Sequence, residues 1–276
     1  LLLSGIDEVN EKLKTVTGDE KNQLLDTMAD SVFVPYIIMA VVLFVLGILI
    51  RKAPLPHVEA EPIKEEEGAK SVKTSIFQFP QLILGVIALF MYVGVEVIAG
   101  DSIIAYGLSL GLPVSQAKWF TTFTLFAMVG TYALGVILIP KYMSQTTALR
   151  LSGLLGIVLS LVIVNTTGFT SVLLVAALGI ANALVWPAIW PLAIDGLGKF
   201  TKTGAAFLIM AISGGAILTP MYGRLVDYLK EVYLADGMEE VLATSQSANQ
   251  GYWILLPAYI IIFLYALKGH KIKSWR

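Results

Sequence analysis

The sequence predicts an all-α integral membrane protein with seven transmembrane helices. Of its 276 residues, 57% are apolar and 14% are charged, and the mean hydropathy is +0.78. A soluble domain of this length is much less apolar. The apolar residues also gather in seven stretches, and a helix needs about 20 such residues to cross a bilayer core. The 24 Gly and 11 Pro are spread through these stretches, which excludes collagen-like and low-complexity classes.

The predicted spans follow one another along most of the chain. They run over 33–50, 81–110, 117–139, 149–165, 171–194, 204–226 and 252–267. The second span is long, which fits a tilted helix or one that bends near Gly100. Residues 5–31 are polar, with apolar positions near helical spacing, and predict either a short surface helix or a loop.

A polar segment separates the first span from the other six. Residues 53–79 hold three prolines and three consecutive glutamates with almost no apolar periodicity, as is typical of a linker. The sequence opens on three leucines without an initiator Met or signal-peptide features, so we expect a piece of a longer protein. The domains expected are an extracytoplasmic loop at 1–32, the last helix of a first bundle at 33–52, a cytoplasmic linker at 53–79 and a six-helix bundle at 80–276.

The distribution of Lys and Arg predicts the orientation. If the linker is cytoplasmic, 13 of the 19 Lys and Arg residues lie on that side of the membrane. Cytoplasmic loops carry such an excess of positive charge. We therefore expect the C-terminus to be cytoplasmic.

Two acidic residues in the second span are candidates for substrate binding or ion coupling. An ionisable side chain in hydrocarbon costs a few kcal/mol, so such residues are functional candidates by default. Glu96 lies roughly 22 Å along the helix from its start, past the midplane of the bilayer. It can carry a proton or bind a hydroxylated solute, or it can tie two helices together. Asp101 lies about 140° round the helix from Glu96 and nearer the outer surface.

The fifth span contains two prolines and two tryptophans in its middle and inner half. Pro187 and Pro191 each remove a helical hydrogen bond, so we expect a kink or an opening there. Trp186 and Trp190 are four residues apart and share a face, which suits binding of a sugar, although interfacial tryptophan is a common alternative. Asn182 lies one turn before Trp186 and needs a polar partner, either a substrate or another helix.

Small residues mark the sixth span as a packing face. Gly214 and Gly215 lie in a run of small residues, and Pro220 follows. Small residues let helix backbones approach closely in membranes, so we expect packing here, with gating as the alternative.

Several classes of function are disfavoured. The absence of Cys excludes disulfides and thiolate chemistry, and both histidines lie outside the apolar stretches, so we expect no metal and no enzyme. The net charge of −1 indicates no particular partner, and we expect none that is a nucleic acid. A seven-helix receptor or retinal protein is a distant alternative, because the last span lacks the Lys that a retinal Schiff base needs.

Two runs carry a family resemblance. WPAIWPLAIDGLGKFTKTGAAFLIMAISGGAILTPMYGRLVD at 186–227 and MYVGVEVIAGDSIIAYG at 91–107 resemble the fucose:proton symporter family of the major facilitator superfamily, in particular its glucose/galactose branch. The six later spans also form two sets of three, which is the repeat unit of that superfamily. Glu96 stands where the fucose transporters carry Gln, and the glucose/galactose branch is similar in carrying Glu.

The resemblance implies a function and its partners. It implies the major facilitator superfamily fold, here the sixth helix and the C-terminal six-helix bundle, in the bacterial inner membrane. It also implies uptake of a hexose with a proton as the coupling ion, no other cofactor, and an N-terminal half as partner. An amino sugar, a polyol or another solute, or facilitated diffusion without a proton, remain alternatives.

Overall fold

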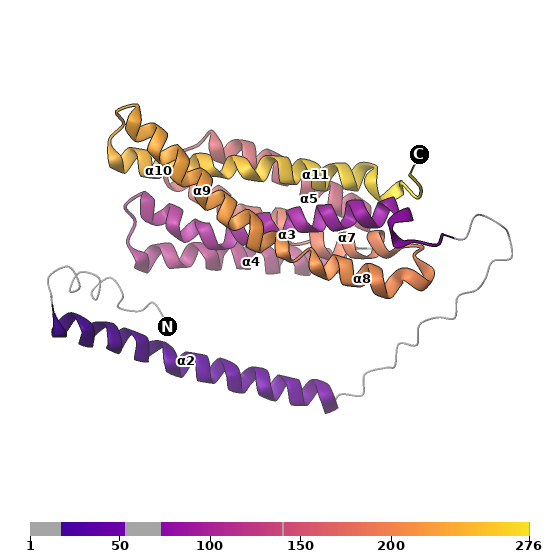
Figure 1. Ribbon diagram of the computed structural model, residues 1–276, viewed down its shortest axis with the longest axis horizontal. Helices are drawn as coiled ribbons and strands as arrows, with labels where there is room; N and C mark the ends of the chain where they lie inside the picture. The colour runs from indigo at the N-terminus through magenta and orange to yellow at the C-terminus, as the bar shows by residue number, and fades with distance from the viewer. Residues whose placement is uncertain (1–17, 53–72, 140, 276) are drawn as a thin grey trace. The chain divides into compact units, whose positions relative to one another are not determined.

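The computed structural model describes residues 18–52, 73–139 and 141–275, and all regular elements in these ranges are helical (Figure 1). These residues fall into two compact units, one of which contains helix α2 (Asp19–Lys52) and the other nearly all of the remaining helices. Seven helical segments within them are long and apolar enough to cross a membrane. The predicted class and the predicted set of seven spans are therefore confirmed.

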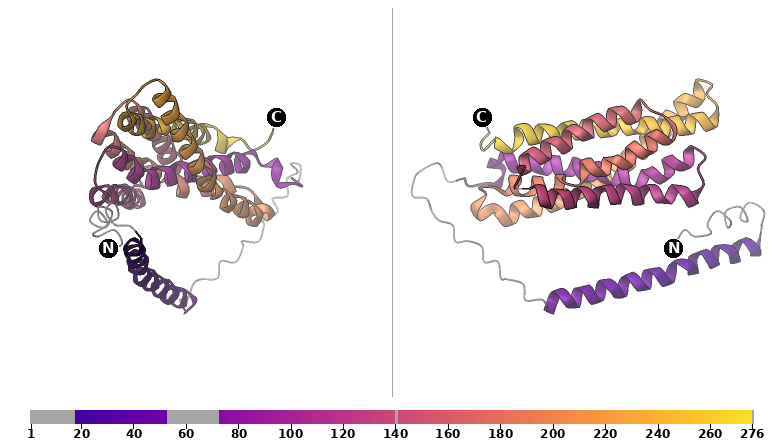
Figure 2. Two further views of the ribbon diagram at one scale, coloured as in Figure 1. Left: turned by 60° about the vertical axis from the view of Figure 1, so that its left-hand side comes forward. Right: turned by 180° about the vertical axis from the view of Figure 1, so that it is seen from behind.

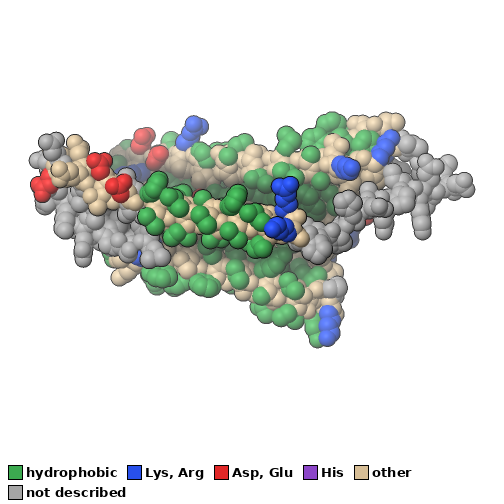
Figure 3. Space-filling model, turned by 90° about the horizontal axis from the view of Figure 1, so that it is seen from below, with side chains coloured by type: hydrophobic (Ala, Val, Ile, Leu, Met, Phe, Trp, Pro, Cys, Tyr) green, Lys and Arg blue, Asp and Glu red, His purple; other side chains and the backbone are tan. Residues whose placement is uncertain are grey.

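Helix α2 extends further than the first predicted span. It begins at Asp19, runs through Pro35 and ends with Arg51 and Lys52 in its last turn, where positive charge complements the helix dipole. Good helix formers such as Glu, Leu and Ala precede the apolar stretch and explain the early start. Apolar side chains along the helix are exposed, between an acidic and a basic end (Figure 3). The first 17 residues of the predicted loop and residues 53–72 of the predicted linker lie outside the described ranges.

The second unit is a bundle whose spanning segments run in alternating directions along the chain (Figure 2). Six membrane-spanning segments correspond to the predicted spans, and three of them consist of two helices each. The helices are α3 (Pro80–Ser109), α4 (Val114–Leu138), α5 (Gln145–Val164), α6 (Gly168–Asn182), α7 (Val185–Ile194), α8 (Thr201–Met210), α9 (Ser213–Ala235), α10 (Glu240–Gln250) and α11 (Leu255–Leu267), with 3-10 turns η1 (Ile76–Gln78), η2 (Gly198–Phe200), η3 (Gly251–Ile254) and η4 (Gly269–Lys271).

Helix α3 is the centre of this bundle. It packs against α6, α7, α9 and α11, while α5 packs against α6 and α11. Leu89 and Ile98 of α3 are fully buried. The helix is continuous over its 30 residues and is not interrupted at Gly100, whose carbonyl accepts a hydrogen bond of 2.7 Å from the Thr121 hydroxyl of α4. The second predicted span is therefore one long helix without a break.

Glycines allow α3 and α9 to touch backbone to backbone. A Cβ atom added to Gly214 would collide with the Phe90 carbonyl of α3, and one added to Gly215 would come within 2.9 Å of Val97. In the other direction, Gly94 of α3 receives the Leu218 side chain. The small residues of the sixth predicted span therefore lie where the two helices approach most closely. Pro220, further along α9, is exposed.

A buried amide joins four helices at one end of the bundle. Asn249 of α10 shares the two hydrogens of Nδ2 among the Tyr106 hydroxyl at 2.9 Å, the Ile163 carbonyl at 3.0 Å and the Ser171 hydroxyl at 2.8 Å. Helix α5 ends at Val164, and the last carbonyls of a helix have no partner within it. Asn249 thus satisfies buried polar groups that hydrocarbon would leave unpaired.

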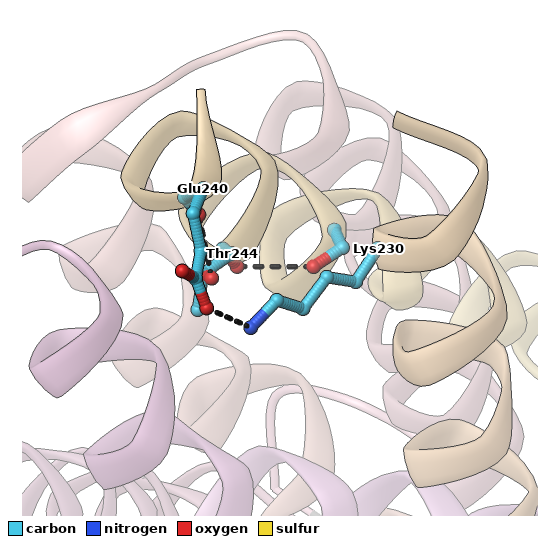
Figure 4. A network of polar contacts seen from close by, with 4 residues as sticks. Lys230, Glu240 and Thr244 are labelled. Carbon is cyan, nitrogen blue, oxygen red and sulfur yellow. Dashed lines mark hydrogen bonds and ion pairs between the residues drawn. The ribbon is translucent and has the colours of Figure 1, made fainter. Parts of the chain in front are cut away.

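The hairpin between α9 and α10 lies at the same end and is polar. Its turn contains Gly237 at φ +81°, a left-handed conformation that suits glycine. Lys230 of α9 and Glu240 of α10 form an ion pair of 3.4 Å, and the Thr244 hydroxyl donates to the Glu240 carbonyl at 2.7 Å (Figure 4). An exposed pair of this kind contributes up to about 1 kcal/mol.

We call the other end of the bundle the basic end, because it contains Lys73, Lys199, Lys202, Lys268, Lys271 and Lys273. Here the C-terminal segment contacts the residue that follows α7 and the turn η1 that precedes α3. Lys273 forms an ion pair of 2.7 Å with Asp195, which follows α7, and the Trp275 indole donates to the Phe77 carbonyl at 2.6 Å. Desolvation, together with the positive charge of Lys273, lowers the pKa of Lys73.

The contact between α3 and α9 yields a test. Replacing Gly214 by Ala should lower the free energy of unfolding by about 1–3 kcal/mol, because the two backbones must separate. Gly223→Ala is the matched control, since an added Cβ there meets open space in the same helix and Ala is the better helix former. Thermal unfolding in detergent micelles measures both. Equal melting temperatures for the two variants would show that the close approach does not limit stability.

Candidate functional site

The fifth span is broken in the middle, as its prolines predict. Helix α6 ends at Asn182 and α7 begins at Val185. Pro187 lies in the first turn of α7, where a missing N–H costs no helical hydrogen bond. The proline ring would clash with the carbonyl four residues earlier, which belongs to Ala183, and this residue lies in the break. Pro191 lies inside α7. The break places Asn182 and Trp186 on either side of an irregular turn.

Trp186 and Trp190 form a stacked pair on α7. Their ring centroids are 5.9 Å apart with an angle of 22° between the planes, and both side chains are half-buried. They border an open cavity of about 410 Å³ together with Pro187, Pro191 and Ile209 of α8. The pair therefore presents a broad aromatic surface to this cavity.

Glu96 of α3 is connected to this surface by a tyrosine. The Tyr92 hydroxyl, one helical turn before Glu96, lies close enough to the Glu96 carboxyl group to interact with it. The Tyr92 ring lies 6.4 Å from the Trp186 ring, centroid to centroid. Tyr92 is buried and Glu96 is half-buried, so the acid remains accessible from one side while it is held on the other.

Asn182 is held from a third helix. The Tyr259 hydroxyl of α11 donates a hydrogen bond of 2.8 Å to Asn182 Oδ1, and both residues are fully buried. Tyr259 also lies in the neighbourhood of Glu96. Within the described ranges no acceptor is found for Asn182 Nδ2. The amide therefore retains an unused donor beside the break.

The structure thus brings together four of the five candidate binding residues. Glu96, Trp186 and Trp190 are linked through Tyr92, and Asn182 joins them through Tyr259. Asp101 is exposed and lies more than one turn beyond Glu96 along α3, outside this group. Gly214 and Gly215 lie in the contact of α9 with α3, as described above.

Two members of the group were missed by sequence reasoning. Tyr92 precedes Glu96 by four residues, and side chains at this spacing meet on a helix, so the signal was present in the sequence. Tyr259 is separated from Asn182 by 77 residues, and no local pattern connects them. Its only mark is a hydroxyl in an apolar span, which needs a partner, and Tyr252 and Tyr265 carry the same mark in that span.

The chemistry of the group combines one proton-carrying acid with neutral hydrogen-bonding groups and aromatic faces. Tyrosine hydroxyls and an amide can donate and accept, and indole rings offer flat apolar surfaces. Among the described residues, no three His, Cys, Asp or Glu side chains come together as metal ligands would. The arrangement suits a polar, uncharged solute that has both hydroxyl groups and C–H faces.

Comparison with known proteins shows which sequences this chain resembles. No family model matches the chain. It is 34% identical over 208 residues to the glucose/galactose transporter of Brucella abortus (strain 9-941), an alignment covering 72% of this chain and 48% of the relative. Identity to the L-fucose-proton symporter is 26% for Haemophilus influenzae and 24% for Escherichia coli K12, over 86% and 82% of this chain. The chain spans about half the length of these relatives.

Solved structures define the fold. The crystal structure of the Escherichia coli fucose:proton symporter matches 93% of this chain and 60% of its own with a TM-score of 0.67 at 22% identity. The same symporter, described as a major facilitator superfamily transporter in the outward conformation, matches with a TM-score of 0.65. The chain is therefore a multi-pass membrane protein with the major facilitator superfamily fold. Within that class, its sequence is similar to those of the glucose/galactose transporters and the L-fucose-proton symporters.

The bond between Tyr259 and Asn182 gives a second test. Tyr259→Phe should lower stability by about 1–3 kcal/mol, because it leaves the buried Asn182 carbonyl unpaired. Adding Asn182→Leu removes both polar groups and should restore most of that loss. Thermal unfolding of the single and double variants in detergent provides the measurement. A double variant less stable than Tyr259→Phe alone would show that Asn182 has other partners in the fold.

Proposed function

We propose that this chain forms the sugar-binding and proton-coupling part of a secondary transporter that takes up a hexose of the glucose or galactose type with a proton. The observation that carries the proposal is the placement of Glu96, beside Tyr92 and the tryptophan pair, at the break between α6 and α7. Transporters place substrates at interrupted helices near the midplane. The names of the homologous proteins support the sugar and the proton.

In this proposal Glu96 carries the proton. A charged carboxylate crossing an occluded, low-dielectric state costs several kcal/mol. Protonation removes the charge and so lowers that barrier. Tyr92 orients the carboxyl group and offers its hydroxyl as a partner in both protonation states. Uptake of the proton on one side and its release on the other then couples the movement of sugar to the proton gradient.

The remaining members of the group bind the sugar. The stacked indoles receive the C–H face of the ring, and the free Asn182 amide donates to a hydroxyl. Tyr259 acts through Asn182 by fixing the side of the amide that faces the solute.

We further infer the setting of the chain. The excess of Lys and Arg at the basic end supports a cytoplasmic location for that end and for the C-terminus, in the bacterial inner membrane. The greater length of the relatives supports an N-terminal six-helix half as the partner that closes the other side of the sugar site. We expect no enzymatic activity and no cofactor other than the proton.

Replacing Glu96 tests the coupling. Glu96→Gln in the transporter complete with its N-terminal half should abolish accumulation of labelled glucose or galactose driven by an inward proton gradient, while sugar exchange persists. Glu231→Gln, the same change at an exposed position of α9, should accumulate sugar normally. Uptake is measured in vesicles with and without a protonophore. If Glu96→Gln accumulates as much sugar as the parent, Glu96 is not the coupling residue. If uptake by the parent does not depend on the proton gradient, the protein catalyses facilitated diffusion and not symport.

Replacing Trp186 tests the sugar platform. Trp186→Ala should raise the sugar concentration for half-maximal uptake about tenfold, since an aromatic contact contributes up to about 1.5 kcal/mol beyond burial. Trp119→Ala, which removes an exposed indole from α4, is the control. The concentration dependence of exchange measures both. An unchanged half-saturation concentration for Trp186→Ala would assign Trp186 to packing, and a panel of fucose, amino sugars and polyols as competitors identifies the solute.

A further inference from the structure

A second cavity lies in the bundle near the basic end. It has a volume of about 590 Å³ and is formed by Leu84 and Ile87 of α3, by residues of α11 and by the C-terminal segment at Ile272. This volume falls within the range of about 300–1,000 Å³ of ordinary ligand sites. None of the tryptophans, Glu96 or Asn182 lines it. It is therefore separate from the candidate sugar site.

The walls of this cavity are aliphatic and exposed. Leu264 is 56% exposed and Ile87 is 42% exposed, although both belong to membrane-spanning helices. The Tyr265 ring also contributes to the wall, but its hydroxyl lies against Gly85 between helices. A sugar would find few hydrogen-bonding partners on such a surface. A hydrocarbon chain, in contrast, would cover the exposed aliphatic groups.

The rim of the cavity is positively charged. Lys268 lines the cavity at the end of α11, and Lys271 follows it in η4, next to the lining residues Gly269 and Ile272. Both lysines are exposed. Asp195 is the acidic residue bound to the C-terminal segment, and its carboxylate is paired with Lys273 at 2.7 Å. Lys268 and Lys271 therefore present positive charge that this aspartate does not neutralise.

The combination of an apolar groove and a basic rim specifies a ligand. We propose that this cavity binds an acyl chain of an anionic phospholipid of the bilayer, whose headgroup phosphate is held by Lys268 and Lys271. Basic pockets between transmembrane helices bind anionic headgroups in this way. Long lysine side chains at helix ends reach the headgroup level while their stems cover apolar surface. The site depends on the membrane location of the chain and not on sugar transport.

The lipid site can be tested on the whole detergent-solubilised protein. Native mass spectrometry, with phosphatidylglycerol or phosphatidylcholine added in equal amounts, counts bound lipid. Phosphatidylglycerol should bind at least tenfold more tightly than phosphatidylcholine, and the double variant Lys268→Gln, Lys271→Gln should lose that preference, because each lysine contributes about a fivefold gain near an anionic surface. The double variant Lys199→Gln, Lys202→Gln, which removes two exposed charges at the same end but outside the cavity, should retain it.

Further variants separate the chain site from the charge site. Leu264→Trp should fill the groove and reduce binding of both lipids, and Lys268→Arg with Lys271→Arg should bind phosphatidylglycerol as the parent does. Thermal unfolding identifies variants that fail to fold. The proposal is overturned by equal binding of the two lipids to the parent, by equal losses in the two glutamine double variants, or by displacement of lipid with inorganic phosphate alone, which would indicate a bare anion site. A groove that takes up no lipid because another part of the transporter covers it would also overturn the proposal.

Discussion

The requirement that buried backbone groups find partners without water governs this structure. In hydrocarbon each unpaired amide or carbonyl costs several kcal/mol, so spanning segments are helical and irregular backbone is confined to protected positions. The break after Asn182 lies against α3, and its flanking residues Ala183 and Val185 are buried. Asn249 does the same at the end of α5 by donating hydrogen bonds to the Ile163 and Thr166 carbonyls. The candidate site and the polar end of the bundle are both consequences of this constraint.

The site depends on how tightly its supporting helices are fixed. Helix α3 carries Glu96 and Tyr92, and the glycine contacts with α9 determine its position from one side. Tyr259 links α11 to the end of α6 from the other side. Tyr259 therefore links α11 to α6 and at the same time orients Asn182, a candidate binding residue. This explains why the site draws on side chains from three parts of the chain that are far apart in sequence.

Much of the fold could be predicted from the sequence, because hydrophobic length and proline act locally. The seven spans and the break near Pro187 follow from such local signals. Helix α10 was not predicted, since its sequence is polar and its stability comes from contacts such as Asn249 with Tyr106. The ion pair of Asp195 with Lys273 was not predicted either, because 78 residues separate the two side chains. Pairings across long sequence separations are decided by the packed bundle, and a single sequence does not show them.

The length of the sixth span has a practical consequence for imaging this protein. Its helical segment covers Gly198–Ala235, or 38 residues in η2, α8 and α9, whereas about 20 helical residues are enough to cross a hydrocarbon core. The surplus length lies at the polar hairpin of α9 and α10, where Lys230 and Glu240 form their exposed ion pair. Small membrane proteins often have no feature outside the detergent micelle that can be used to align particle images. A nanobody raised against the hairpin of α9 and α10 would provide such a feature for electron microscopy.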